Sequence, residues 1–154
     1  MSEASSTLST IDQSKARRRE FEVMMESTLA EFQQKMHELT RLVECWLHDT
    51  GVCITASDVY IKINLPFVHK YPLSTINFEY AGREITLLPK YIFLAGGAKG
   101  AISFLCGGAH PKCFTIFMEV PQREHEGWII CSEGERSIDG VVLTEKEFFR
   151  TLHI

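Results

Sequence analysis

Apolar residues between positions 25 and 46 recur at alternating steps of four and three, and this spacing restricts the fold more than any other feature. Such steps keep side chains on one side of an α-helix, because the helix completes a turn every 3.6 residues. The stripe consists of Met25, Leu29, Phe32, Met36, Leu39, Val43 and Trp46. Charged residues mostly fall elsewhere. We therefore predict one amphipathic helix over about residues 14–49, stopped near Gly51, which can adopt the left-handed conformation.

A helix of this length would reach about 50 Å, which exceeds the diameter of a small domain. We expect its second half, from about Phe32, to pack on the rest of the chain, with Trp46 in the core. The first half, which includes the basic run KARRR at positions 15–19, is then free to act as an interaction arm or to meet another chain. The candidate interaction residues are Arg17, Arg18, Phe21, Met25 and Leu29.

After Gly51 the apolar period changes from near 3.6 to 2. Residues 59–65, VYIKINL, alternate apolar and polar side chains as a strand with one buried face does. Further strand candidates lie at 76–80, 83–88, 91–95, 101–106, 113–120 and 127–132. The short connections between them favour an antiparallel meander, because parallel strands need longer crossovers.

A second, short helix is predicted over about residues 144–152, where Thr144 and Glu147 have the spacing of a capping box. The fold class is therefore α+β: a long N-terminal helix packed on a mainly antiparallel meander, with a short C-terminal helix. The 154 residues suit one domain. We expect a disordered leader at 1–13, rich in Ser, Thr and Ala, and a single domain at 14–154 with its sheet at about 52–143.

Composition bears on location and partners. A net charge of −4 provides no global attraction to nucleic acid or to anionic membranes. No apolar run approaches the roughly 20 residues that span a bilayer, and the first residues lack the pattern of a signal peptide. Five cysteines are an odd number, which favours reduced thiols. We expect a cytoplasmic protein without a membrane partner. A nucleic-acid accessory role through Arg17, Arg18 and Arg19 is the least favoured hypothesis.

The segment CGGAHPKC at 106–113 is the main candidate for site chemistry. Cys106, His110 and Cys113 could bind zinc as two thiolates and an imidazole, with a fourth ligand from a distant Cys or His. The same residues suit a glycine-rich hairpin loop between two strands. We favour the loop, and expect no cofactor. The alternative is a small metal- or thiol-dependent hydrolase centred on these three residues.

Two further segments resemble known sites only in part. GGAKGA at 96–101 places Lys99 among glycines, but it lacks the P-loop pattern and leads into a strand. REHEG at 123–127 lacks the second histidine of a zinc-protease helix, and we interpret it as a solvated hairpin tip.

The sequence shows no arrangement of residues typical of a catalytic site, so we favour a protein without enzymatic activity. We expect a non-enzymatic interaction protein that binds a protein partner or a second copy of itself. Its acidic balance suits recognition of a basic protein surface. Small bacterial proteins of the immunity, antitoxin, chaperone or defence-accessory type often have this arrangement of elements, so the comparison rests on the architecture and not on a site.

Overall fold

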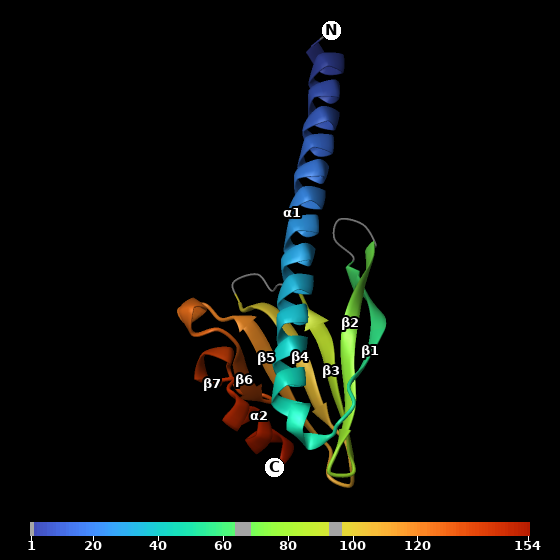
Figure 1. Ribbon diagram of the computed structural model, residues 1–154. Coiled ribbons are helices and arrows are strands. Elements are labelled where there is room, and N and C mark those ends of the chain that lie inside the picture. The colour runs from blue at the N-terminus through green and yellow to red at the C-terminus, as the bar shows by residue number, and fades with distance from the viewer. Residues whose placement is uncertain (1, 64–68, 93–96) are drawn as a thin grey trace.

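The computed structural model describes residues 2–63, 69–92 and 97–154 (Figure 1). The chain has the predicted α+β fold: one long helix, a seven-stranded antiparallel sheet and a short C-terminal helix. The helices are α1 (Ser2–Leu47) and α2 (Glu145–Leu152), and the short 3₁₀ turns are η1 (His48–Thr50), η2 (Glu124–Glu126) and η3 (Ser137–Asp139). The strands are β1 (Thr55–Ile63), β2 (His69–Tyr80), β3 (Arg83–Tyr91), β4 (Lys99–Cys106), β5 (Lys112–Glu119), β6 (Ile129–Ser132) and β7 (Val141–Val142).

Helix α1 begins at Ser2, so the predicted start near residue 14 was wrong. Neither Pro nor Gly interrupts residues 2–47, and Ser or Thr costs only a few tenths of a kcal/mol relative to Ala within a helix. The expected division into a leader and a domain stays a prediction. At the other end, η1 is stopped by Gly51 in the left-handed conformation (φ 75°), as predicted.

The sheet is a meander in which the strands follow one another in sequence order. Ala81 and Gly82 both have positive φ, at 52° and 76°, and form the predicted tight turn between β2 and β3. Two strand predictions extend beyond the described residues, at positions 64 and 65 and at 93–95. Tyr91 ends β3, and β7 was not predicted.

Both helices pack on one face of the sheet and share its main core. The α1 residues of this core are at most 2% exposed, and they are Phe32, Met36, Leu39, Val43 and Leu47. The α2 residue Phe148 is fully buried, with its ring centroid 5.2 Å from that of Trp46 and 5.8 Å from that of Phe104. Trp46 itself is only half-buried, so its predicted place inside the core was wrong; it lies over Phe148 at the core margin.

The capping prediction for α2 is confirmed on one side. The Thr144 hydroxyl accepts a hydrogen bond from the backbone N–H of Glu147 (3.2 Å). The Glu147 carboxylate, however, accepts from Arg150 Nε (2.8 Å), one turn later in the helix. The cap therefore orients α2, and with it Phe148.

We predict that Phe148→Ala lowers the free energy of unfolding by about 3 to 5 kcal/mol, because it leaves a large cavity where α1, α2 and the sheet meet. Trp46→Ala should cost clearly less, since water already reaches part of this ring. Urea denaturation of both variants checks the order. An equal or larger loss for Trp46→Ala would contradict this account of the core.

Hydrogen exchange should divide α1 into two parts. Residues 10–20 are all exposed, and a helix without tertiary packing is marginal in water. Their amides should exchange roughly a thousandfold or more faster than those of residues 32–47, which open only with the core. Mass spectrometry or NMR of the purified protein measures this ratio, and equal protection of both parts would show that the first part is covered.

Candidate protein-interaction site

The first described turns of α1 project beyond the sheet (Figure 1). We call residues 10–24 the arm; all of them are exposed except Phe21, which is half-buried. At 1.5 Å per residue the arm is about 22 Å long. The first fully covered residue after it is Met25, which is 1% exposed.

The structure distributes the five predicted interaction residues between the arm and the body. Arg17 and Arg18 are exposed on the arm, and Arg18 Nε lies 4.0 Å from Glu22 Oε1 in an exposed ion pair. Phe21 stands at the base of the arm. Met25 is buried and Leu29 is half-buried against the core, so the expectation that these two lie in the free half was wrong. Packing of the stripe begins two turns before Phe32.

The arm carries apolar surface that the stripe does not predict. Val23 is 65% exposed and Met24 is 48% exposed. Given 3.6 residues per turn, Val23 lies roughly opposite the buried Met25 on the helix and Met24 lies on its flank. Ile11 is 45% exposed and precedes Ser14, Arg18 and Phe21 by steps of three, four and three, which continue the stripe beyond Met25. The stripe thus extends along the arm, but with Ser14 and Arg18 at its centre.

The three candidate metal ligands are not brought together around one point. Cys106 is paired with Lys112, whereas Leu105 is paired with Cys113. Because neighbouring residues of a strand point to opposite faces, Cys106 lies on the helix-covered face and Cys113 on the other. His110 is exposed in the connecting loop. Within the described ranges, no group of three or more His, Cys, Asp or Glu side chains is arranged to hold a metal ion.

The loop at 107–111 serves as a structural junction through Arg83, which sequence reasoning missed. Arg83 Nε donates to the carbonyl of Gly107 (2.9 Å), and Nη1 donates to the carbonyl of Leu152 at the end of α2 (3.0 Å). The Gly107 N–H donates in turn to the carbonyl of Glu84 (2.8 Å). One guanidinium therefore joins the β4–β5 loop to the last turn of α2.

Lys99, from the glycine-rich segment, anchors α1 to the sheet. Its Nζ lies 2.8 Å from Glu31 Oε2 on α1 and 3.9 Å from Glu119 Oε2 on β5. The hydrogen bond with Glu31 raises the pKa of Lys99 above its usual value. The lysine is about half exposed, so the ion pair contributes modestly to stability.

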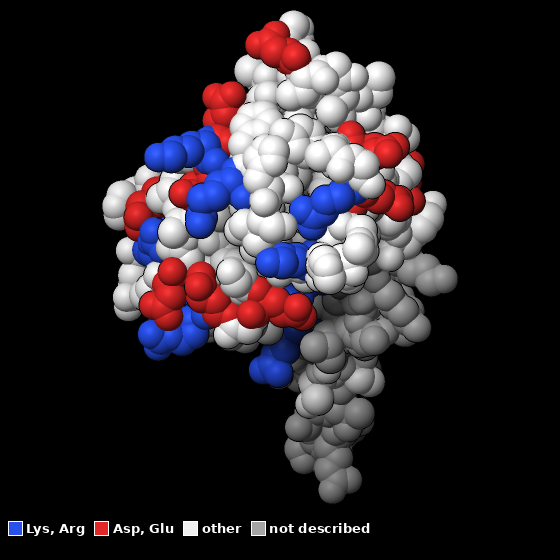
Figure 2. Space-filling view, turned by 90° about the horizontal axis from the view of Figure 1, so that it is seen from below, with Lys and Arg blue, Asp and Glu red and all other residues white. Residues whose placement is uncertain are grey.

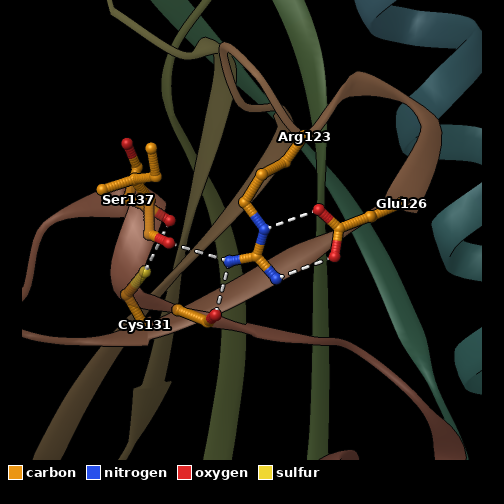
Figure 3. A network of polar contacts seen from close by, with 6 residues as sticks. Arg123, Glu126, Cys131 and Ser137 are labelled. Carbon is orange, nitrogen blue, oxygen red and sulfur yellow. Dashed lines mark hydrogen bonds and ion pairs between the residues drawn. The ribbon is translucent and has the colours of Figure 1, made fainter.

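A second arginine organises the loops that flank β6 (Figure 3). Arg123 donates from Nε and Nη2 to the two carboxylate oxygens of Glu126, at 2.8 and 3.1 Å. Its Nη1 donates to the carbonyls of Ile138 (3.0 Å) and Gly140 (2.6 Å). The hydrogen bonds from Arg123 lower the pKa of Glu126. Part of the REHEG segment is therefore an ordered junction between η2 and η3, although His125 itself is exposed.

The cysteines of the sheet are protected against ionisation. Burial raises the pKa of the Cys131 thiol to about 11, and Cys131 Sγ lies 3.5 Å from the carbonyl oxygen of Arg136. Burial also raises the pKa of Cys106 and, on the other face, of Cys113. A nucleophilic thiol needs the opposite shift, because the thiolate is the reactive form.

Charge is mixed over the end of the molecule opposite the arm. Figure 2 shows Lys and Arg side chains interspersed with Asp and Glu there, not gathered into one basic patch. Among the described residues, no helix combines the length and apolar character that crossing a membrane requires.

No protein-family model, no curated protein and no solved structure matches this chain. The functional argument therefore depends on the geometry of the arm and of the sheet.

Thiol alkylation should separate the five cysteines into classes. Cys45 and Cys53 are exposed and should react first; Cys113 should follow; Cys106 and Cys131 should react only as the protein unfolds. Time-resolved mass spectrometry with iodoacetamide at neutral pH gives the order. If Cys106 or Cys113 reacted before Cys45, the thiol would be activated and the loop would need to be reconsidered as a catalytic site.

Proposed function

We propose that the chain is a non-enzymatic protein-interaction module that binds a helical segment of a partner protein along the arm of α1. The observation that carries this proposal is that the stripe of α1 continues along the arm past the sheet, apolar at Ile11 and Phe21 and polar at Ser14 and Arg18, and that Ile11 stays 45% exposed. Below the arm, the same stripe is buried in the core.

Energetics support a bound state for the arm. Helical turns without packing are close to neutral in stability, because most of the stability of a helix in a protein comes from burial of its apolar face. Ile11 and Phe21 offer such a face, and a partner helix would bury both. Val23 and Met24, which are also exposed, widen the apolar surface at the base of the arm.

Charge adds selectivity to the proposed contact. Lys15, Arg17, Arg18 and Arg19 place four cations within five positions of the arm. A polar residue within a helix–helix seam favours one register and one partner over others. We therefore expect the partner segment to be acidic opposite Arg18. The net negative charge of the whole chain had instead favoured a partner with a basic surface. A cytoplasmic location stays a prediction from the cysteine content.

The test compares one double change and one single change on α1. Ile11→Glu combined with Arg18→Glu should weaken the partner complex at least tenfold, because it buries a carboxylate and places like charges opposite each other. Native mass spectrometry of the protein isolated from its own cells identifies the complex, and titration of the purified partner measures the affinity.

Leu42→Glu is the matched control. Leu42 is 39% exposed on the packed half of α1, so the same kind of change should leave both the complex and the melting temperature unaltered. An unchanged complex with the arm variant, or the absence of any bound protein in the wild-type sample, would contradict the proposal.

A further inference from the structure

The sheet ends in two edges that differ in length and protection. At one edge, β7 has only two residues and leads directly into α2 through Leu143, whose N–H donates to the carbonyl of Trp128 (2.8 Å). At the other edge, β1 has nine residues and, among the described strands, is paired with β2 alone. In Figure 1, no described element lies beside the outer side of β1.

Strand β1 carries one of the devices that usually protect an exposed edge, its charged residues Asp58 and Lys62, but no proline and no β-bulge. Its sequence, TASDVYIKI, contains neither Pro nor Gly, and its pairing with β2 runs from Thr55↔Asn77 to Ile63↔His69 without a register shift. Edges of this kind are templates for the addition of another strand. Among Thr55–Tyr60, only Val59 is partly buried, against the main core; Tyr60 is 70% exposed.

The residues of β1 are self-complementary in one antiparallel register. When two copies of β1 pair about a two-fold axis at Tyr60, position 58 of one strand lies opposite position 62 of the other. An acidic residue, Asp58, then faces a basic one, Lys62, on both sides of the axis. Opposite charges in cross-strand pairs are stabilising, and the central Tyr60 pair adds an aromatic contact.

Other two-fold registers within the strand do not give this match. An axis at position 58 or 62 would place Asp58 or Lys62 opposite its own copy, which repels. An axis at 59 or 61 leaves both charges opposite uncharged residues. Only the axis at Tyr60 also places Val59, on the core side, opposite the β-branched residue at position 61.

We infer that β1 is a self-association edge, at which two copies of this chain pair antiparallel about Tyr60 and join their sheets edge to edge. Asp58 is exposed on this strand, as a contact with a second copy requires. The interface goes beyond the arm proposal and does not depend on it, since β1 and the arm are separate surfaces.

A charge exchange on the full-length purified protein tests the inference. Sedimentation equilibrium over a concentration series should show a dimer. Asp58→Lys alone and Lys62→Asp alone should each raise the dimer dissociation constant about tenfold, because each change turns two attractive cross-strand pairs into repulsive ones. The double variant Asp58→Lys/Lys62→Asp restores the pairs and should return the constant to within a factor of about three.

Asp49→Lys is the matched control, because the Asp49 side chain is fully exposed in η1, away from β1, and its reversal should not affect the dimer. A protein that stays monomeric at all concentrations would overturn the inference. So would single variants that dimerise as well as the wild type, or a double variant that stays as weak as the single ones. A monomer that instead captures an extended peptide on β1 counts against self-association.

Cross-linking fixes the register independently. In a background with Cys45→Ser and Cys53→Ser, Tyr60→Cys should form an interchain disulfide under mild oxidation, because the axis places the two positions directly opposite each other. Ala56→Cys lies on the same face of β1 but four residues from the axis, and should not cross-link. Cross-linking of Ala56→Cys in preference to Tyr60→Cys would overturn the register. The arm variant Ile11→Glu/Arg18→Glu should dimerise normally, which separates this interface from the arm.

Discussion

Burial of one stripe of α1 against one face of the sheet is the contact on which the rest of this structure depends. Phe32, Met36, Leu39 and Val43 are nearly inaccessible to water, and the strands supply the opposing apolar layer. Phe148 closes the end of that layer, held there by the Thr144 cap and by the hydrogen bond from Arg83 to the end of α2. Helix, sheet and C-terminal segment are thereby fixed to one another.

Periodicity made most of this fold predictable. The four-and-three spacing of α1 and the alternation in the strands are local patterns, and local patterns report which face is buried. The turn at Ala81–Gly82 and the stop at Gly51 follow from backbone preferences of the same short range. The start of α1 was missed because Ser and Thr have intermediate helix propensities, so a stretch rich in them neither predicts a helix nor excludes one. The burial of Met25 was missed because the spacing of a stripe shows which side of a helix is apolar, but not how many turns of the helix are covered by the sheet.

The candidate sites were less accessible to sequence reasoning, for a physical reason. Arg83 and Arg123 act on backbone carbonyls, and a carbonyl acceptor has no sequence identity by which it could be recognised. The CGGAHPKC segment illustrates the converse: three suitable ligand types lie close in the chain, yet strand alternation places Cys106 and Cys113 on opposite faces. The exposed edge of β1 became evident only once the strand order was known. Residues 17 and 18, by contrast, were placed on the arm correctly from the length of the helix alone.

The unbroken backbone of α1 has a mechanical consequence. Without Pro or Gly between Ser2 and Leu47, α1 has no hinge in its sequence, so the exposed and the packed turns form one stiff rod whenever the arm is helical. The rod is held from Met25 onwards, so a sideways load on Ile11 acts through a lever of about 20 Å with its fulcrum at the upper margin of the core. Torque then reaches the layer formed by Leu39, Val43 and Phe148. A partner of the kind proposed for the arm would thus be coupled to the interior of the molecule by leverage, and the direction of its pull would matter as much as its affinity.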